Sequence, residues 1–171
     1  MPPIDNTSAE LTDQIRQILR LEKEGRISEA IEAVLRVLEI NSQMGNDNFQ
    51  NAVSLSKLAS LYNIKGNKPE AISCYLRAID LFRLSIGRQA NGPLVESFVG
   101  SLMALASIYV DKGQLTESEE LYNEAVQVAS NLIGENSEEF AYTLYDLAMY
   151  YRTRAQYDKA ETLFLQSIAI Q

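Results

Sequence analysis

Few side chains in this sequence could carry out chemistry. The 171 residues include no histidine and one cysteine, Cys74. The lack of histidine removes the most common general base, the most common zinc ligand and every dyad that pairs histidine with serine or cysteine. Cys74 stands on an apolar helical face, where a packed thiol is the ordinary outcome. We therefore expect a protein that is not an enzyme.

Two acidic segments could suggest a divalent-metal site, namely ESEE at 117–120 and ENSEE at 135–139. Carboxylates near helix starts are explained more simply by their favourable interaction with the helix dipole. The segments also lack the alternating ligand order of a calcium-binding loop. We therefore predict neither a metal nor a cofactor.

Composition restricts the class of partner. The chain has a net charge of -8 and a pI of about 4.6, so phosphate backbones and anionic lipid surfaces are repelled on average. No stretch approaches the ~18 uninterrupted apolar residues of a membrane span, and MPPIDNTSAE at the start lacks the pattern of a secretion signal. We expect a cytoplasmic protein with no nucleic-acid partner and no membrane insertion.

The elements that position these side chains repeat along the chain. Four small residues, each followed by a helical apolar pattern, are separated by 41, 47 and 42 residues: Ala30, Ala71, Ser118 and Ala160. Further columns match in the last three units, among them Leu55, Leu102 and Leu144, and Tyr62, Tyr109 and Tyr151. Within one unit these residues form one helical stripe, and small residues at the crossing let two helices approach closely. The spacing predicts helices over 8–24, 28–43, 49–65, 69–86, 95–112, 116–133, 138–154 and 157–170.

Turn and capping residues support these boundaries. Gly66 and Gly113 can adopt the left-handed conformation that ends a helix, whereas Ala155 in the last unit predicts a less regular turn. Thr116 with Glu119, and Thr7 with Glu10, have the spacing of a capping box. Asn67 before Pro69 marks another helix start.

The pattern resembles the tetratricopeptide repeat, and SNLIGENSEEFAYTLYDLA with the period of about 42 residues is similar to the kinesin-light-chain type. The resemblance implies an all-α, right-handed α-solenoid of about four stacked helix-turn-helix repeats. We expect a flexible N-terminus over 1–7 and a single domain over 8–171, with units at about 8–44, 48–87, 94–134 and 137–171. Gly87–Pro93 is expected to form a longer loop, and helix 8–24 to act partly as an N-terminal cap.

The resemblance also implies a concave groove on the first helix of each pair, away from the leucine, alanine and tyrosine stripe. The groove residues it indicates are Val53, Ser56, Lys57, Ser60, Asn63, Met103, Ala104, Ser107, Val110, Asp111, Tyr142, Tyr145, Asp146, Met149 and Arg152. Methionine and tyrosine suit an adaptable peptide groove. Lys57, Asp146 and Arg152 are either charges that orient a ligand or ordinary solvated charges.

Two departures from the family narrow the ligand. The columns of a terminal-carboxylate clamp hold Ser56, Ser60, Ala104, Tyr142 and Asp146, which argues against a peptide bound by its terminal carboxylate. The asparagine that kinesin-light-chain repeats favour is replaced by Lys57, Ala104 and Asp146. The family's cargo specificity is therefore not carried over.

Three functions remain open at this stage. We expect a non-catalytic scaffold that binds a protein or peptide in the concave groove. A self-associating module is the first alternative, because LFLQSIAI at the end of the chain is not covered by a polar helix. A regulatory segment of a larger signalling protein or enzyme is the other.

Overall fold

The computed structural model describes residues 6–43, 45, 48–86 and 92–170, without the side chains of residues 6–9. All regular structure in these ranges is α-helical, which confirms the prediction of an all-α repeat fold. The bounds lie within three residues of the predicted ones. The helices are α1 (Asn6–Lys23), α2 (Ile27–Gln43), α3 (Asn48–Ile64), α4 (Lys68–Ile86), α5 (Gly92–Asp111), α6 (Leu115–Leu132), α7 (Glu138–Thr153) and α8 (Tyr157–Ile170).

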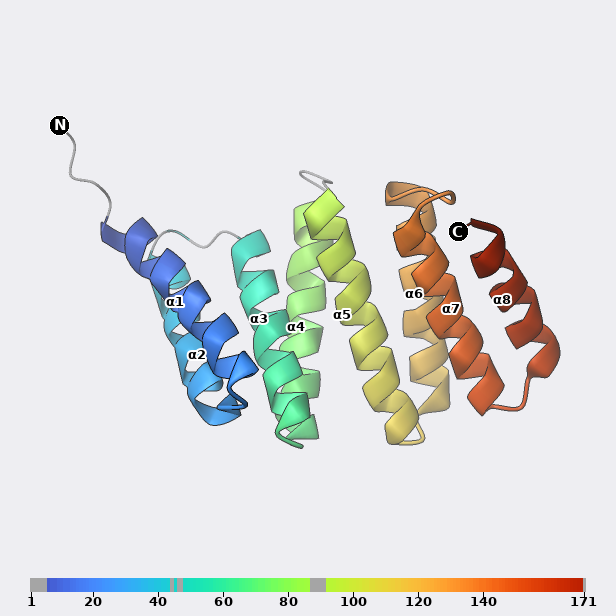
Figure 1. Cartoon of the computed structure of the whole chain (residues 1–171), viewed down its shortest axis with the longest axis horizontal. Coiled ribbons are helices and arrows are strands. Elements are labelled where there is room, and N and C mark those ends of the chain that lie inside the picture. The colour runs from blue at the N-terminus through green and yellow to red at the C-terminus, as the bar shows by residue number, and fades with distance from the viewer. Residues whose placement is uncertain (1–5, 44, 46–47, 87–91, 171) are drawn as a thin grey trace. The chain divides into compact units, whose positions relative to one another are not determined.

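The chain divides into two compact units, Met1–Leu84 and Ser85–Gln171. Unit 1 contains α1 to α3 and nearly all of α4, and unit 2 contains α5 to α8. Within each unit consecutive helices form antiparallel pairs (Figure 1). That residues 8–171 form a single domain stays a prediction.

Small side chains lie where the helices cross. The residues that define the period are all buried: Ala30, Ala71, Ser118 and Ala160. The Ser118 hydroxyl donates to the carbonyl of Ala106 at 2.9 Å, and the Ser167 hydroxyl donates to the carbonyl of Ala141 at 2.8 Å. Because each hydroxyl has a partner on the neighbouring helix, serine replaces alanine at these crossings without leaving a buried polar group unpaired.

The turn inside each helix pair has one geometry in the last three repeats. Gly66, Gly113 and Ala155 have φ angles of 83°, 74° and 56°. Each donates its N–H to the carbonyl three residues earlier at 2.9 to 3.0 Å, and the next residue donates to the carbonyl five residues earlier at 2.8 to 3.0 Å. The prediction of a less regular turn at Ala155 is therefore wrong, because alanine adopts the left-handed conformation that glycine adopts elsewhere.

The predicted capping box at Thr116 is also wrong. Helix α6 begins directly after Gln114, whose side chain donates to Glu117 at 2.9 Å, so Thr116 lies inside the first turn. Glu119, the other half of the predicted box, bonds to α7 instead. Thr7 lies within α1, and its side chain falls outside the described residues.

Helix α5 begins three residues earlier than predicted. Gly92 and Pro93, which were expected in a loop, form its first turn. Proline is tolerated there because an N–H in the first turn has no partner within the helix. The rest of that predicted loop, 87–91, falls outside the described residues.

Helix α5 is also the one described helix long and apolar enough, by length and composition, to cross a membrane, with a mean hydropathy of 1.5. Half of that window is buried inside the protein. A core helix covered on more than one side has the same composition. The absence of membrane insertion stays a prediction.

Candidate functional site

Unit 2 contains a cavity of about 570 Å³ between α5 and α7, with α6 beneath them. Its walls come mainly from the two first helices of the repeat pairs. The lining residues are Gly100, Met103, Ala104, Ser107, Val110, Tyr122, Tyr145, Asp146, Met149, Tyr150 and Thr153. Seven of these belong to the predicted groove: Met103, Ala104, Ser107, Val110, Tyr145, Asp146 and Met149.

Helical spacing explains why these side chains meet. On α5, Gly100, Met103, Ser107 and Val110 follow one another at intervals of three or four residues, which places them on one face. The adjoining face of the same helix carries the buried repeat residues, such as Leu105. The pattern that packs the repeat therefore also turns a second stripe toward the cavity.

The floor of the cavity is a packed aromatic cluster. Tyr122 of α6 and Tyr150 of α7 are both buried, and their ring centroids lie 5.2 Å apart with a tilted arrangement. Met103 and Val110 of α5 pack against this cluster from the cavity side. Close packing makes such a floor rigid, while the two lining methionines, Met103 and Met149, keep an adaptable wall.

Asp146 is the charged residue among those that line the cavity. Its side chain is reached by solvent, yet the surrounding protein removes enough water to raise its pKa above the usual aspartate value. Burial also raises the pKa of Tyr122 to about 12, with the charge of Asp146 as the next cause. At neutral pH the cavity therefore presents one carboxylate over a neutral phenol.

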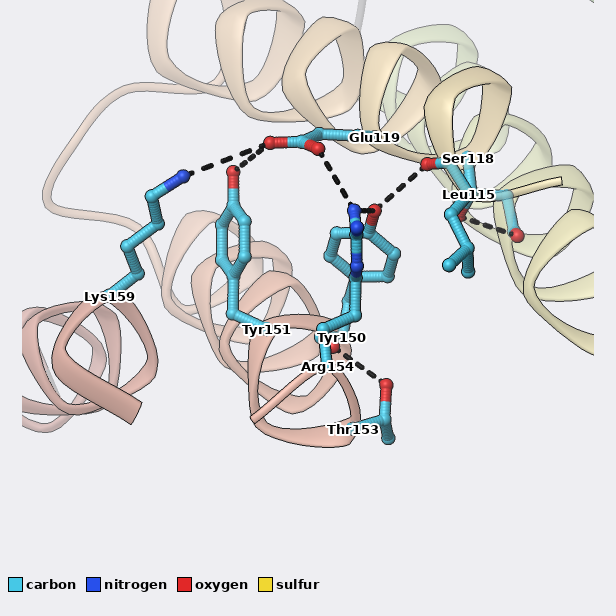
Figure 2. A network of polar contacts seen from close by, with 9 residues as sticks. Leu115, Ser118, Glu119, Tyr150, Tyr151, Thr153, Arg154 and Lys159 are labelled. Carbon is cyan, nitrogen blue, oxygen red and sulfur yellow. Dashed lines mark hydrogen bonds and ion pairs between the residues drawn. The ribbon is translucent and has the colours of Figure 1, made fainter. Parts of the chain in front are cut away.

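A polar network next to the cavity ties α6 to α7 and α8 (Figure 2). The Tyr151 hydroxyl donates to Glu119 at 2.9 Å, and the Arg154 guanidinium donates to the other oxygen of Glu119 at 3.3 Å. The Lys159 ammonium lies 4.0 Å from Glu119 and 4.7 Å from the centre of the Tyr151 ring. Burial and the bond to Glu119 raise the pKa of Tyr151 to about 12, so Tyr151 remains a donor at neutral pH.

Tyr150 joins this network to the cavity. Its hydroxyl donates to the carbonyl of Leu115 at 2.9 Å and accepts from Arg154 at 2.9 Å (Figure 2). Because Tyr150 also forms part of the cavity floor, contacts on α6 hold that floor in place.

The predicted groove residues of α3 lie in unit 1. Val53 and Lys57 line a smaller cavity of about 140 Å³ with residues of α1, α2 and α3: Leu11, Ile15, Ile18, Leu19, Val34, Val37, Gln50 and Ser54. The Lys57 ammonium lies 3.1 Å from the carboxylate of Glu22 on α1. Lys57 is therefore paired within its own unit in the free chain, and its role as a charge that orients a ligand stays a prediction.

Six predicted residues line neither cavity. Ser60 is hydrogen-bonded to Tyr75 of α4. The Tyr142 hydroxyl donates to Glu138 at 2.8 Å on the exposed surface of α7. Four others lie on the first helices outside the cavity walls: Ser56, Asn63, Asp111 and Arg152.

The sequence pattern missed four residues of the larger cavity. Gly100 and Thr153 continue the two lining stripes by three and four residues, so the spacing could have found them. Tyr122 belongs to the buried core cluster of unit 2, and it reaches the cavity from below. Nothing in the repeat marks Tyr150, because the equivalent residues of the earlier units are Leu61 and Ile108.

The acidic segments have local roles. Glu117 accepts from the side chain of Gln114, Glu135 from Ser130 at 3.0 Å, and Glu138 from Tyr142. Within the described ranges the structure brings together no group of three or more side chains that could hold a metal ion.

Comparison with protein families identifies the class of protein. Two models, both described as tetratricopeptide repeat, match residues 52–83 and 98–171, which together are more than half of the chain. The chain belongs to the tetratricopeptide-repeat family. Repeats of this family are generally non-catalytic protein-interaction modules. The chain is accordingly a protein-interaction scaffold in general terms.

Solved structures place the fold with kinesin-light-chain-like repeats. A protein of Podosopora anserina with kinesin light chain nearly identical TPR-like repeats is 23% identical over 94% of this chain and 74% of its own, with a TM-score of 0.72. BtubC (BKLC) from P. vanneervenii is 18% identical over 100% of this chain and 74% of its own, and MamA is 16% identical over 94% and 77%, each with a TM-score of 0.65. No curated protein matches the sequence.

Proposed function

We propose that the cavity between α5 and α7 binds an extended or helical segment of a partner protein. The observation that carries this proposal is the cavity itself, about 570 Å³ with a packed floor and side chains that the repeat core does not require. A ligand site of this kind combines apolar walls with a few polar groups that fix orientation. Met103, Met149 and Tyr145 supply the walls here, and Ser107 and Asp146 supply polar atoms.

The test is a selection of random peptides displayed on phage against the whole chain. Selected peptides should lose binding to Ser107→Phe, since this exposed serine lines the cavity and a phenyl ring there would fill it. Gln127→Phe places the same ring on the exposed surface of α6 and is the matched control. Equal binding to wild type and Ser107→Phe, with unchanged helical circular dichroism, would reject the cavity as the site.

Self-association is a second candidate function, favoured by the surface of α8. Leu165 and Ile168 are 61% and 67% exposed on this helix. Exposed apolar side chains that lie close together favour burial against a partner surface. Light scattering at increasing concentration should show a dimer that Leu165→Glu dissociates, and a wild-type monomer throughout would reject this candidate.

A further inference from the structure

The cavity of unit 2 contains a negative charge that has no counter-ion within the described part of the chain. No lysine or arginine is among the lining residues, and Asp146 forms no ion pair or hydrogen bond with a described residue. Asp146 is exposed to solvent in the free chain, and a ligand that covered it would have to pair its carboxylate, because a charge that is removed from water is costly unless it is paired. Asp146 is therefore a polar group that a ligand could complete.

The equivalent residue of unit 1 is a charge that already has a partner of opposite sign. Lys57 occupies the same repeat column as Asp146 and is paired with Glu22 of α1 at 3.1 Å. Both residues line a cavity of their own unit, but only the unit 1 charge has a partner from its own unit. The contrast indicates that the missing partner of Asp146 is cationic.

The surroundings of Asp146 fit a long cationic side chain. Met103 and Met149 offer apolar surface, against which lysine and arginine pack their methylene stems while the charged end stays at a polar group. Tyr145 is 48% exposed at the same wall and offers an aromatic face, which attracts cations. An ionised pair between an arginine or a lysine and a carboxylate forms stronger hydrogen bonds than neutral groups do.

We propose that the partner segment is a basic peptide, whose arginine or lysine side chain enters the cavity between α5 and α7 and pairs with Asp146, with apolar residues on either side of it. This inference rests on the proposed function and specifies its ligand. A segment with an acidic side chain at this point would be repelled.

The experiment uses the peptides selected on wild type, synthesised with the basic residue intact and with arginine replaced by its neutral analogue citrulline. Asp146→Asn should weaken the arginine peptide about ten- to a hundred-fold, as expected for loss of a hydrogen-bonded ion pair. It should leave the citrulline peptide unchanged. Asp158→Asn removes one negative charge from the exposed start of α8 and should change neither affinity by more than about twofold. A second selection on Asp146→Lys should enrich acidic residues at the same peptide position.

The outcomes separate this inference from the proposed function. Peptides that Ser107→Phe blocks but that carry no basic residue would overturn the inference and leave the cavity as a binding site. The same holds if Asp146→Asn and Asp158→Asn weaken the arginine peptide equally. Peptides that bind Ser107→Phe as well as wild type would overturn both.

Discussion

Two helix junctions at the same place in the repeat, α2 with α3 in unit 1 and α6 with α7 in unit 2, use different chemistry. In unit 1 the positions hold Ile31 and Leu61, which are 6% and 0% exposed. In unit 2 the equivalent residues are Glu119 and Tyr150, which belong to a hydrogen-bonded network. Both junctions occupy the same place in one repeat pattern, so the repeat tolerates either an apolar or a polar junction.

The two junctions differ in how strictly they fix the orientation of the side chains that meet there. Apolar contacts stabilise without specifying an orientation, whereas hydrogen bonds fix the positions of the groups that they join. Tyr150 is fixed by bonds to Leu115 and Arg154, and it forms part of the cavity floor. Unit 2, which has the larger of the two cavities, therefore also has the junction that can hold the cavity floor in one place.

The largest expected effect comes from breaking the polar junction. Glu119→Ala leaves the hydroxyl of the buried Tyr151 without its acceptor, whereas the Arg154 guanidinium keeps its bond to Tyr150. We expect a loss of about 2 kcal/mol in the free energy of unfolding, measured by urea denaturation, because unpaired polar groups in such sites cost about that much.

The control for this prediction is Glu120→Ala, which removes a neighbouring, exposed carboxylate of the same helix. It should cost less than about 0.5 kcal/mol. Equal effects of the two substitutions would mean that the network contributes nothing to stability, and the comparison of the junctions would then be one of sequence alone.

Most of the fold follows from local patterns, whereas the polar junction does not. Helix positions were predictable because apolar spacing, small crossing residues and left-handed turns act within about one repeat. Glu119 was assigned to a capping box, since its spacing from Thr116 allowed that role and nothing in sequence shows that Tyr151 and Arg154 stand opposite it. Which side chains meet between two repeats depends on how their helices are aligned in space, and the sequence pattern does not specify that alignment.

For the cavity too, the lining residues were predictable from helical spacing, whereas the pairing of its charges was not. Helical spacing brought Met103, Ser107 and Met149 together, because a second stripe accompanies the packing stripe on each helix. Lys57 and Asp146 share a repeat column, and that column did not predict that Lys57 would be paired within its unit while Asp146 would not. The carboxylate that neutralises Lys57 comes from Glu22 on α1, the helix whose sequence departs most from the family pattern.

A smaller effect is expected at the turns, where unit 1 has Gly66 and unit 2 has Ala155 at the same repeat position. Ala155→Gly should stabilise the protein by about 1 kcal/mol, because a left-handed conformation costs alanine more than the extra freedom of unfolded glycine costs. Gly66→Ala should destabilise by about the same amount. A Cβ at Gly66 meets nothing within 4 Å, so only the backbone conformation is tested.

Thermal unfolding measures both changes. A decrease in stability for Ala155→Gly would contradict the interpretation of the Ala155 turn as strained, and opposite signs for the two substitutions would support it. The Gly66 and Ala155 turns would then differ in residue type but share their geometry.

The smallest effects on stability are expected for substitutions of Lys57 and Asp146, the two charges that share a repeat column, and these effects differ in sign. Lys57→Gln removes the pair with Glu22 and should cost about 0.5 kcal/mol, an amount that high salt reduces. Asp146→Asn removes a carboxylate whose folded pKa is raised by its loss of water, so it should not destabilise the protein at neutral pH.

The pH dependence gives the sharper test. A carboxyl with a raised folded pKa binds more protons in the folded than in the unfolded chain, so its contribution to stability increases as pH falls through that pKa and is complete below the unfolded value of about 3.9. Relative to wild type, Asp146→Asn should therefore be most stable near neutral pH and lose this advantage in acid. Nuclear magnetic resonance titration of the Asp146 carboxyl should give a pKa above the ordinary aspartate value of about 3.9, and addition of the arginine peptide should lower it. An Asp146 pKa at or below the ordinary aspartate value of about 3.9 would mean that the carboxylate is already satisfied by its own unit, as Lys57 is, and the contrast between the two cavities would not hold.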